Sequence, residues 1–441
     1  MKIKEITAFP IRIPHGHDVE EGKERPPVID FGDYFVDEQA FTSIYSKHHE
    51  TTVIKIETDT GVVGWGEAQS PVSPRTTQVI VEDLVRPLIL GRDPFDIEAI
   101  WTRNYGAMRE RGHPTGFYVD AIAGTDIALW DIVGKVAGKP VHKLAGGRYR
   151  DKVLLYAGIG GTDPEKVADM AEEHVGYGYK ALKLHLLLDA EGVAEIARAV
   201  RKRIGPSIML MCDVHMRQSV TSAIKLGRDL EKLEFTWLES PLVPDDIPGA
   251  VALCEALDMA VAIGEWSRTR YEMREAFERR AYDVVMHDIA RTGITEGHRI
   301  GTIADTYNIP VAPHVGGGGI LSVAATVEYS ASCSNFMIME HSHHANDFKN
   351  AITSINYGPT NGYFEVTDKP GLGIEIDQSL VEKYLGLLVK VFRQVRRNVV
   401  GYEPPYVLAV ELAVQQSRGG SLMRRRVVSK TQRCWLHTNN E

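Results

Sequence analysis

Six polar side chains recur at almost constant intervals in the second half of this 441-residue chain. Successive members are 26 residues apart, except for one interval of 23, and in order they are Asp213, Glu239, Glu265, Asp288, His314 and Glu340. The first three are carboxylates that each end a short apolar run, where an unpaired charge is costly to bury. Converging carboxylates supply the oxygen ligands that Mg²⁺ requires. We therefore predict that Asp213, Glu239 and Glu265 bind Mg²⁺.

These intervals match the length of one strand-and-helix unit of a parallel barrel. Eight short apolar runs alternate with helical or loop segments between residues 148 and 360: VLLYAGI, KALKLHL, IMLMCDV, FTWLESP, AVAIGEW, DVVMHDI, IPVAPHV and FMIMEHS. Strands that are buried on both faces of a parallel sheet have such continuous apolar sequences. The polar residues would then lie together at the C-terminal mouth of an α/β barrel, where barrel enzymes carry out their chemistry.

The N-terminal part of the chain, residues 1–147, has a different pattern. Two strand signals are present, at Ile3 to Ile13 and at Val53 to Trp65, and the second predicts a hairpin around Thr58 to Gly61. Between these signals, His15 to His49 is polar and charged and is predicted to be a loop. Loops of this length are often lids over a binding site.

Helical periodicity and C-terminal composition mark the remaining segments. The stretch from Asp120 to Lys139 predicts a helix that ends at Gly138. After the barrel, Tyr363 to Asp377 reads as a strand and a turn, and Leu380 to Val395 as one more helix. Residues 396–441 are basic and lack apolar periodicity, which is typical of a disordered tail.

Composition and charge exclude several classes of protein. The chain is 44% hydrophobic and 25% charged, and no apolar run approaches the ~20 residues that cross a bilayer, so we expect a soluble protein without a membrane partner. The four cysteines are scattered without paired spacing, which disfavours disulfides and a zinc cluster and favours the cytoplasm. The net charge of −9 does not favour nucleic-acid binding, although residues 378–441 alone carry +7.

The chain from about Lys2 to Asp377 resembles the enolase superfamily and, within it, the mandelate racemase group. The motifs that carry this resemblance are GWGEA, DIALWDIVGKVAGKPVHKLAGG, ALKLH, MCDVH, WLESP, IGEW, HDIARTGITEG, VAPHVGGGG, MIMEH and PGLGIEID. The resemblance implies a modified (β/α)₇β barrel at residues 148–360, with residues 1–147 and 361–395 forming an α+β capping domain. It also implies the same three metal ligands, and we expect a homo-oligomer.

The resemblance further assigns roles to the other members of the ring. His314 and Asp288 match the His/Asp dyad of the family, in which the carboxylate orients the imidazole and raises its basicity. His314 is therefore the expected general base. Glu340 matches the glutamate that ends the last strand and is expected to hydrogen-bond the substrate, the alternative being a salt bridge within the barrel.

Three further basic residues share strand parity with the ring. Lys183 and His185 are two residues apart, so both side chains point the same way into the barrel. Many members of the group have Lys-x-Lys here, so the second base would be His185, while Lys183 is expected to attract the substrate carboxylate. His215 follows the ligand Asp213 by two residues, and Asp-x-His resembles the sugar-acid dehydratases, whose histidine protonates the departing hydroxyl. Alternatively, His215 merely hydrogen-bonds a neighbouring carboxylate.

Together these residues predict a Mg²⁺-dependent enzyme that removes the proton next to a substrate carboxylate. Loss of a β-hydroxyl from a sugar acid would then give a 2-keto-3-deoxy acid, which is the reaction we expect. Return of the proton to the opposite face, in a racemase or epimerase, or a lactone cycloisomerisation, is the alternative. A third possibility is an inactive barrel with a binding role.

Overall fold

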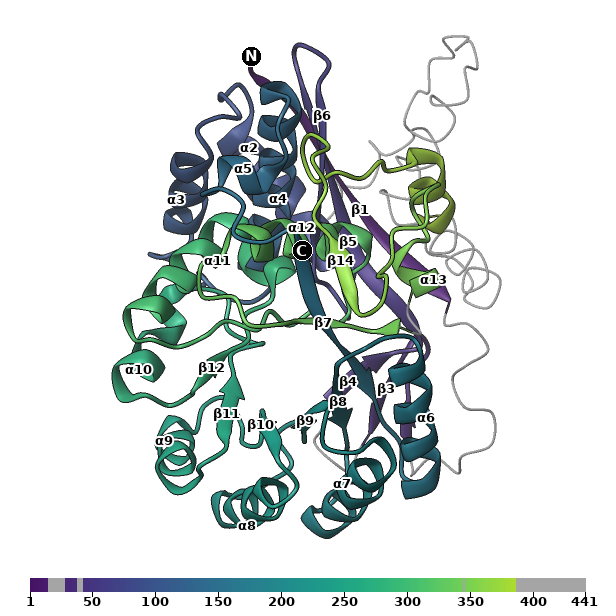
Figure 1. Cartoon of the computed structure of the whole chain (residues 1–441). Helices are drawn as coiled ribbons and strands as arrows, with labels where there is room; N and C mark the ends of the chain where they lie inside the picture. The colour runs from purple at the N-terminus through teal and green to yellow at the C-terminus, as the bar shows by residue number, and fades with distance from the viewer. Residues whose placement is uncertain (15–27, 38–42, 344–345, 386–441) are drawn as a thin grey trace, which may run out of the picture. The chain divides into compact units, whose positions relative to one another are not determined.

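The computed structural model describes residues 1–14, 28–37, 43–343 and 346–385. Its central feature is a ring of parallel strands in the order β12-β11-β10-β9-β8-β7-β13 (Figure 1). Their bounds are β7 (Lys152–Ile159), β8 (Ala181–His185), β9 (Met209–Asp213), β10 (Phe235–Glu239), β11 (Ala260–Ile263), β12 (Val284–Val285) and β13 (Met339–His341). Bridges from Val285 to Val311 and from Val311 to Phe336 close the ring between β12 and β13.

A helix follows each strand position of the ring, and the helices after the first seven positions lie around its outside (Figure 1). They are α6 (Pro164–Gly176), α7 (Ala190–Ile204), α8 (Val220–Glu231), α9 (Ile247–Ala256), α10 (Arg270–Arg279), α11 (Ile289–Thr306) and α12 (Ile320–Ser332). Several start where the sequence offers a capping oxygen: Asp163, Asp189 and Ser219 each accept a hydrogen bond from a backbone N–H in the first turn. The predicted (β/α)₇β barrel is confirmed.

The interior of the ring is a packed core. Its centre holds buried side chains that alternate along the strands with the outward-facing ones, namely Tyr156, Ala181, Met211, Trp237, Ala262, Val284, Met286, Ala312 and Ile338. A second and larger apolar cluster fills the space between the strands and the outer helices. Because side chains occupy the interior, polar groups can converge only at the strand ends.

The N-terminal part forms an antiparallel sheet with helices against it. The sheet order is β1 (Ile3–Pro14), β5 (His48–Thr58) and β6 (Val63–Ala68). The helical segments are α1 (Pro74–Ile80), the π-helical turn η1 (Val81–Val85), α2 (Arg86–Ile89), α3 (Ile97–Ala107), α4 (Phe117–Ala137) and α5 (Val141–Leu144). The capping domain is thus of the α+β class that was predicted. Glycines allow α4 to lie on β6, since a Cβ at Gly66 would come within 2.0 Å of the carbonyl oxygen of Gly124.

The structure differs from the sequence prediction between His15 and His49. The described part of this segment forms an antiparallel three-stranded sheet of β2 (Val28–Asp30), β3 (Tyr34–Asp37) and β4 (Ser43–Ser46). The prediction of a loop was therefore wrong here, because apolar runs within strands of three or four residues are too short to stand out from the polar residues around them. The side chain of Arg12 on β1 joins this sheet to the main one through Asp33 and Glu50.

Several smaller predictions concern element ends. The hairpin between β5 and β6 is present, and α4 ends at Gly138 in the left-handed conformation, as expected. After the barrel come α13 (Asn346–Lys349) and β14 (Tyr363–Glu365), which pairs with β7. Residues 378–385 are helical, and the rest of the predicted last helix and the basic tail lie outside the described residues. No helix among the described residues is long and apolar enough to span a membrane.

Candidate active site

The three carboxylates proposed as metal ligands lie on neighbouring strands of the ring. Asp213 and Glu239 are the last residues of β9 and β10 and are direct partners in the parallel register. Glu265 lies two residues beyond the end of β11, which pairs with the other edge of β10. All three are buried. The 26-residue spacing therefore does bring these carboxylates to one end of the barrel.

Lys183 lies among these carboxylates. Its Nζ is 2.7 Å from Glu239 Oε1, 2.8 Å from Glu340 Oε1 and 3.5 Å from Asp213 Oδ2, and the side chain is 3% exposed. Burial by itself lowers the pKa of Lys183, but the charges of Glu239 and Glu340 outweigh burial and raise that pKa above its ordinary value. Lys183 is therefore a buried cation rather than a surface lysine. The salt bridge considered for Glu340 is also present.

His314 is held between carboxylates on both ring nitrogens. Nδ1 lies 2.8 Å from Asp288 Oδ2, and Nε2 lies 3.0 Å from Glu265 Oε2 and 3.5 Å from Glu340 Oε2. Burial favours the neutral ring, but Glu340 and Glu265 outweigh burial and raise the pKa of His314 well above its ordinary value. Asp288 also caps α11 through the backbone N–H of Ala290. The Asp288 carboxylate thus fixes the orientation of the ring.

His185 and His215 face each other across the strand ends. Their ring centroids are 5.6 Å apart in an edge-on arrangement, and His185 Nε2 lies 3.7 Å from Asp213 Oδ2. The backbone N–H of His215 donates to Asp213 Oδ1 at 2.9 Å. His215 has a φ of 43°, a value that non-glycine residues seldom adopt. Burial lowers the pKa of His215 against the attraction of Asp213 and Glu265. Of the three histidines, His185 is the most exposed.

The donor set fits a hard divalent cation. Five carboxylates meet at this end of the barrel, those of Asp213, Glu239, Glu265, Asp288 and Glu340, and the cations in contact with them are Lys183 and His314. Burial raises the pKa of Glu239, and its acidic neighbours Asp213 and Glu265 add to the rise despite Lys183. A bound cation would relieve this excess of negative charge. Asp213, Glu239 and Glu265 are the three that would hold it.

Two buried residues that the sequence analysis did not single out support the loop after His314. Glu67 on β6 accepts hydrogen bonds from the backbone N–H groups of Gly319 and Ser322, at the start of α12. Lys349 donates to the carbonyl oxygen of Gly318 at 2.8 Å. Glu67 belongs to the GWGEA motif and is the penultimate residue of the buried strand β6, a carboxylate near a strand end like the predicted metal ligands. The capping domain therefore contacts the loop that carries the expected base.

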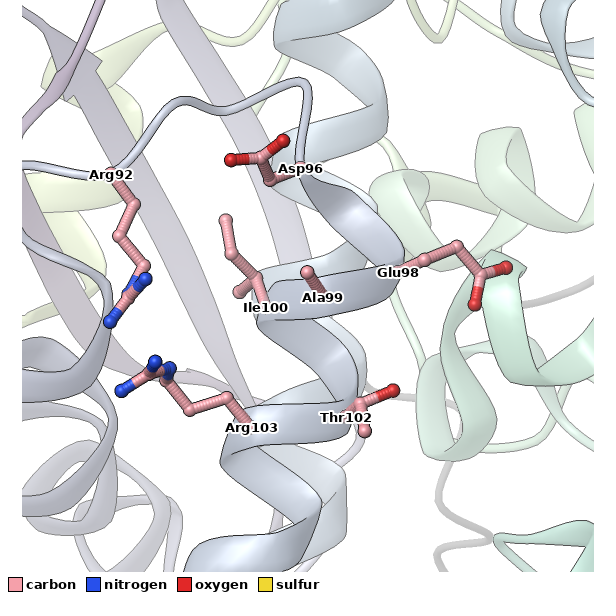
Figure 2. A pocket seen from close by; sticks show the side chains of 7 residues that line it. All are labelled: Arg92, Asp96, Glu98, Ala99, Ile100, Thr102 and Arg103. Atoms are coloured by element: carbon pink, nitrogen blue, oxygen red, sulfur yellow. The ribbon is translucent and has the colours of Figure 1, made fainter.

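A cavity of about 570 Å³ lies elsewhere, on the surface of α3 (Figure 2). Figure 2 shows the side chains of Arg92 and Arg103 beside the helix and that of Glu98 pointing away from them. Residues Arg92 to Arg103 include none of those predicted for the site, and Arg92 is already engaged with the carbonyl oxygen of Leu88. The chemistry is therefore expected at the strand ends and not here.

Two family models match the chain. Residues 38–146 match the mandelate racemase / muconate lactonizing enzyme N-terminal domain, and residues 166–380 match the enolase C-terminal domain-like model. The chain belongs to the mandelate racemase group of the enolase superfamily. As a member of this superfamily the protein is an enzyme, and enolase superfamily members use Mg²⁺.

Named relatives within the enolase superfamily divide between two reactions. The arabinonate dehydratase of Saccharolobus solfataricus is 34% identical over 76% of this chain and 90% of its own length. The D-galactarolactone cycloisomerase of Agrobacterium fabrum is 32% identical over 75% of this chain and 90% of its own. An enolase superfamily member from Agrobacterium tumefaciens has a crystal structure that superposes with a TM-score of 0.81 at 27% identity, covering 86% of this chain and 98% of that one.

Proposed function

We propose that this protein is a Mg²⁺-dependent dehydratase, a lyase that converts a sugar acid into a 2-keto-3-deoxy acid. The observation that carries the proposal is the placement of His314. Its Nδ1 is bound by Asp288 and its Nε2 points to Glu265, so one imidazole lies beside a proposed metal ligand in a fixed orientation. Relatives named for acting on arabinonate and galactarolactone support a sugar acid as the substrate class.

The first step is removal of the proton on the carbon next to the substrate carboxylate. Mg²⁺, when bound by Asp213, Glu239 and Glu265, supplies positive charge next to the carboxylate oxygens on which negative charge develops. In its neutral form His314 takes the proton at Nε2, and Asp288 stabilises the resulting imidazolium through Nδ1. In this proposal Lys183 adds a buried positive charge near the substrate carboxylate, and its ion-pair partner Glu340 accepts a hydrogen bond from the substrate.

The second step is loss of the β-hydroxyl. His215 gives a proton to the hydroxyl oxygen, the carbon–oxygen bond breaks, and water leaves with the bonding electrons. The enol that remains takes up a proton on carbon and releases its hydroxyl proton, and so becomes the 2-keto acid. Because burial lowers the pKa of His215, its protonated form is a stronger acid than ordinary imidazolium, which suits this role.

Cycloisomerisation or epimerisation is the second candidate, and His185 is the observation that favours it. This histidine lies next to Asp213 and is partly exposed, at the position where Lys-x-Lys members have their second base. A proton returned from His185 to the opposite face gives an epimer. Alternatively, the enediolate of a lactone expels the ring oxygen from the β-carbon, so that this carbon–oxygen bond breaks and the lactone ring opens to an isomeric acid. The cycloisomerase relative and the dehydratase relative are almost equally similar to this chain, at 32% and 34% sequence identity.

A screen of acid sugars and their lactones with Mg²⁺ tests the proposal. Formation of a 2-keto acid from at least one aldonic or aldaric acid supports the dehydratase, and such a product must disappear when Mg²⁺ is chelated. Substrates that give no keto acid are examined by NMR in D₂O for exchange of the α-proton and for epimer or isomeric lactone. Turnover to those products alone would replace the dehydratase with the isomerase. Tight binding of sugar acids without exchange would contradict both.

A further inference from the structure

A second group of ligand atoms lies beside the proposed Mg²⁺ site. His185, Asp213 and His215 each offer one ligand atom, and these atoms lie within 4.8 Å of one another. His185 on β8 is the direct register partner of Asp213 on β9. His185 Nε2 is 3.7 Å from Asp213 Oδ2, and the imidazoles of His185 and His215 are in edge contact. The group therefore combines two nitrogen donors and one oxygen donor.

This donor set selects a different metal from the three carboxylates. Mg²⁺ takes oxygen ligands, whereas two imidazoles and a carboxylate suit Zn²⁺ and the later first-row divalent ions. In a tetrahedral site with bonds of about 2.0–2.1 Å, neighbouring ligand atoms are about 3.3 Å apart. The distances between the ligand atoms, at most 4.8 Å, would have to shorten by about 1.5 Å or less to reach this separation. Rotations of the two histidine side chains would close the present group around such an ion.

The surroundings leave the group accessible. The His185 side chain is 45% exposed, so an ion can enter from solvent and keep a water molecule as its fourth ligand. Asp213 Oδ1 accepts the backbone N–H of His215, which orients the carboxylate so that Oδ2 faces His185. Lys183 Nζ is 3.5 Å from the same Oδ2, but its shorter contacts are to Glu239 and Glu340.

We infer that His185, Asp213 and His215 form a binding site for Zn²⁺ or a similar transition-metal ion, which shares Asp213 with the Mg²⁺ site. Binding there engages both imidazoles and one ligand that Mg²⁺ needs. Zn²⁺ should therefore inhibit the enzyme in competition with Mg²⁺, and this kinetic consequence rests on the proposed function. The binding of Zn²⁺ itself does not, because it depends only on the three side chains.

Calorimetric titration of the full-length, metal-free chain with Zn²⁺ tests the site, and Co²⁺ absorption in the visible range reports the ligand geometry. His185→Gln and His215→Gln should each lower the affinity for one equivalent of Zn²⁺ by about tenfold or more, because each removes a nitrogen ligand. His113→Gln is the matched control, since His113 is exposed and lies in the N-terminal part of the chain and not on a barrel strand. Cys434 and His437 are present in every variant, so any Zn²⁺ they bind is common to all.

Glu239→Gln separates this site from the Mg²⁺ site. This variant should keep the Zn²⁺ equivalent while it loses Mg²⁺ binding, because Glu239 belongs to the carboxylate trio alone. The inferred site is wrong if both histidine variants have a Zn²⁺ dissociation constant within threefold of the wild-type value. It is also wrong if Glu239→Gln loses the Zn²⁺ equivalent while the histidine variants keep it. Failure of Mg²⁺ binding to depend on Glu239 would instead contradict the metal assignment of the proposed function.

Discussion

Lys183 Nζ and Glu239 Oε1 are 2.7 Å apart and form a buried ion pair at the centre of the carboxylate group. The same ammonium contacts Glu340 and approaches Asp213. A lysine in this position balances part of the negative charge of the proposed metal ligands in the metal-free protein. The stability of the metal-free protein and its affinity for Mg²⁺ are therefore coupled through Lys183.

Lys183→Met should lower the free energy of unfolding in Mg²⁺-free buffer by about 3–5 kcal/mol, since it leaves buried carboxylates without their cation. Mg²⁺ should stabilise this variant more than the wild type, because the site then carries one more net negative charge. Urea unfolding with and without Mg²⁺ measures both effects. Lys152→Met is the control: Lys152 pairs with Glu365 on the surface, where an ion pair contributes little. A Lys183 variant as stable as wild type without Mg²⁺ would contradict the coupling.

Glu239→Gln should abolish Mg²⁺-dependent turnover and Mg²⁺ binding, and chelation of the metal should have the same effect on the wild type. The substitution keeps the shape of the side chain but removes a charge on which a hard cation depends. Binding is measured by calorimetry and turnover by keto-acid formation. Glu365→Gln, on the exposed part of β14, should leave both unchanged. Unchanged turnover in Glu239→Gln would refute the metal assignment.

His314→Asn should slow exchange of the substrate α-proton with D₂O by at least about 100-fold, which is the usual contribution of a general base. Asn fills similar space but cannot take the proton. Exchange is followed by NMR on a substrate from the acid-sugar screen, with His113→Asn as a surface control. Exchange at the wild-type rate would remove His314 from the mechanism and direct attention to His185.

His215→Asn should separate proton removal from loss of the hydroxyl. Exchange of the α-proton should continue at a rate near that of the wild type, while keto-acid formation slows by about 100-fold or more, because only elimination needs this acid. Both rates are measured on the same substrate in D₂O. An equal loss of exchange and elimination would mean that His215 does not act as the separate acid of the second step.

Asp126 on α4 predicts a pH dependence of stability. Burial raises its pKa to about 6 from 3.8, although its Oδ2 accepts the backbone N–H of Thr295. A raised folded-state pKa stabilises the fold below about pH 3.8, and this contribution is lost as pH rises through about 6. Each pKa unit corresponds to about 1.4 kcal/mol, so the loss is about 3 kcal/mol.

Asp126→Asn should remove this dependence, because the amide keeps an acceptor oxygen and carries no charge. The variant should gain stability relative to the wild type as pH rises from about 4 to 7 and keep that gain at higher pH. Unfolding by urea at a series of pH values gives the difference between the two proteins. Parallel stability curves across this range would show that the Asp126 carboxylate titrates in the same way in the folded and unfolded chains.

The barrel could be predicted from the sequence because its strands are buried on both faces and its polar residues recur with the repeat. Short strands were less predictable: β2, β3 and β4 have three or four residues each, too few for an alternating pattern to outweigh polar turns. The environment of Lys183 was also missed. Nothing in the local sequence ALKLH distinguishes a lysine that is free to bind substrate from one that pairs with Glu239 and Glu340.

The sequence by itself determined which residue types stand at the strand ends, because strand length, helix length and burial set the spacing of Asp213, Glu239 and Glu265. Only the tertiary structure decided which of these groups face one another. Contacts such as that of His185 with Asp213 depend on the parallel register and on side-chain rotation at the barrel mouth. Glu67 reaches the loop after His314 because β6, more than 200 residues away in the sequence, packs beside α12.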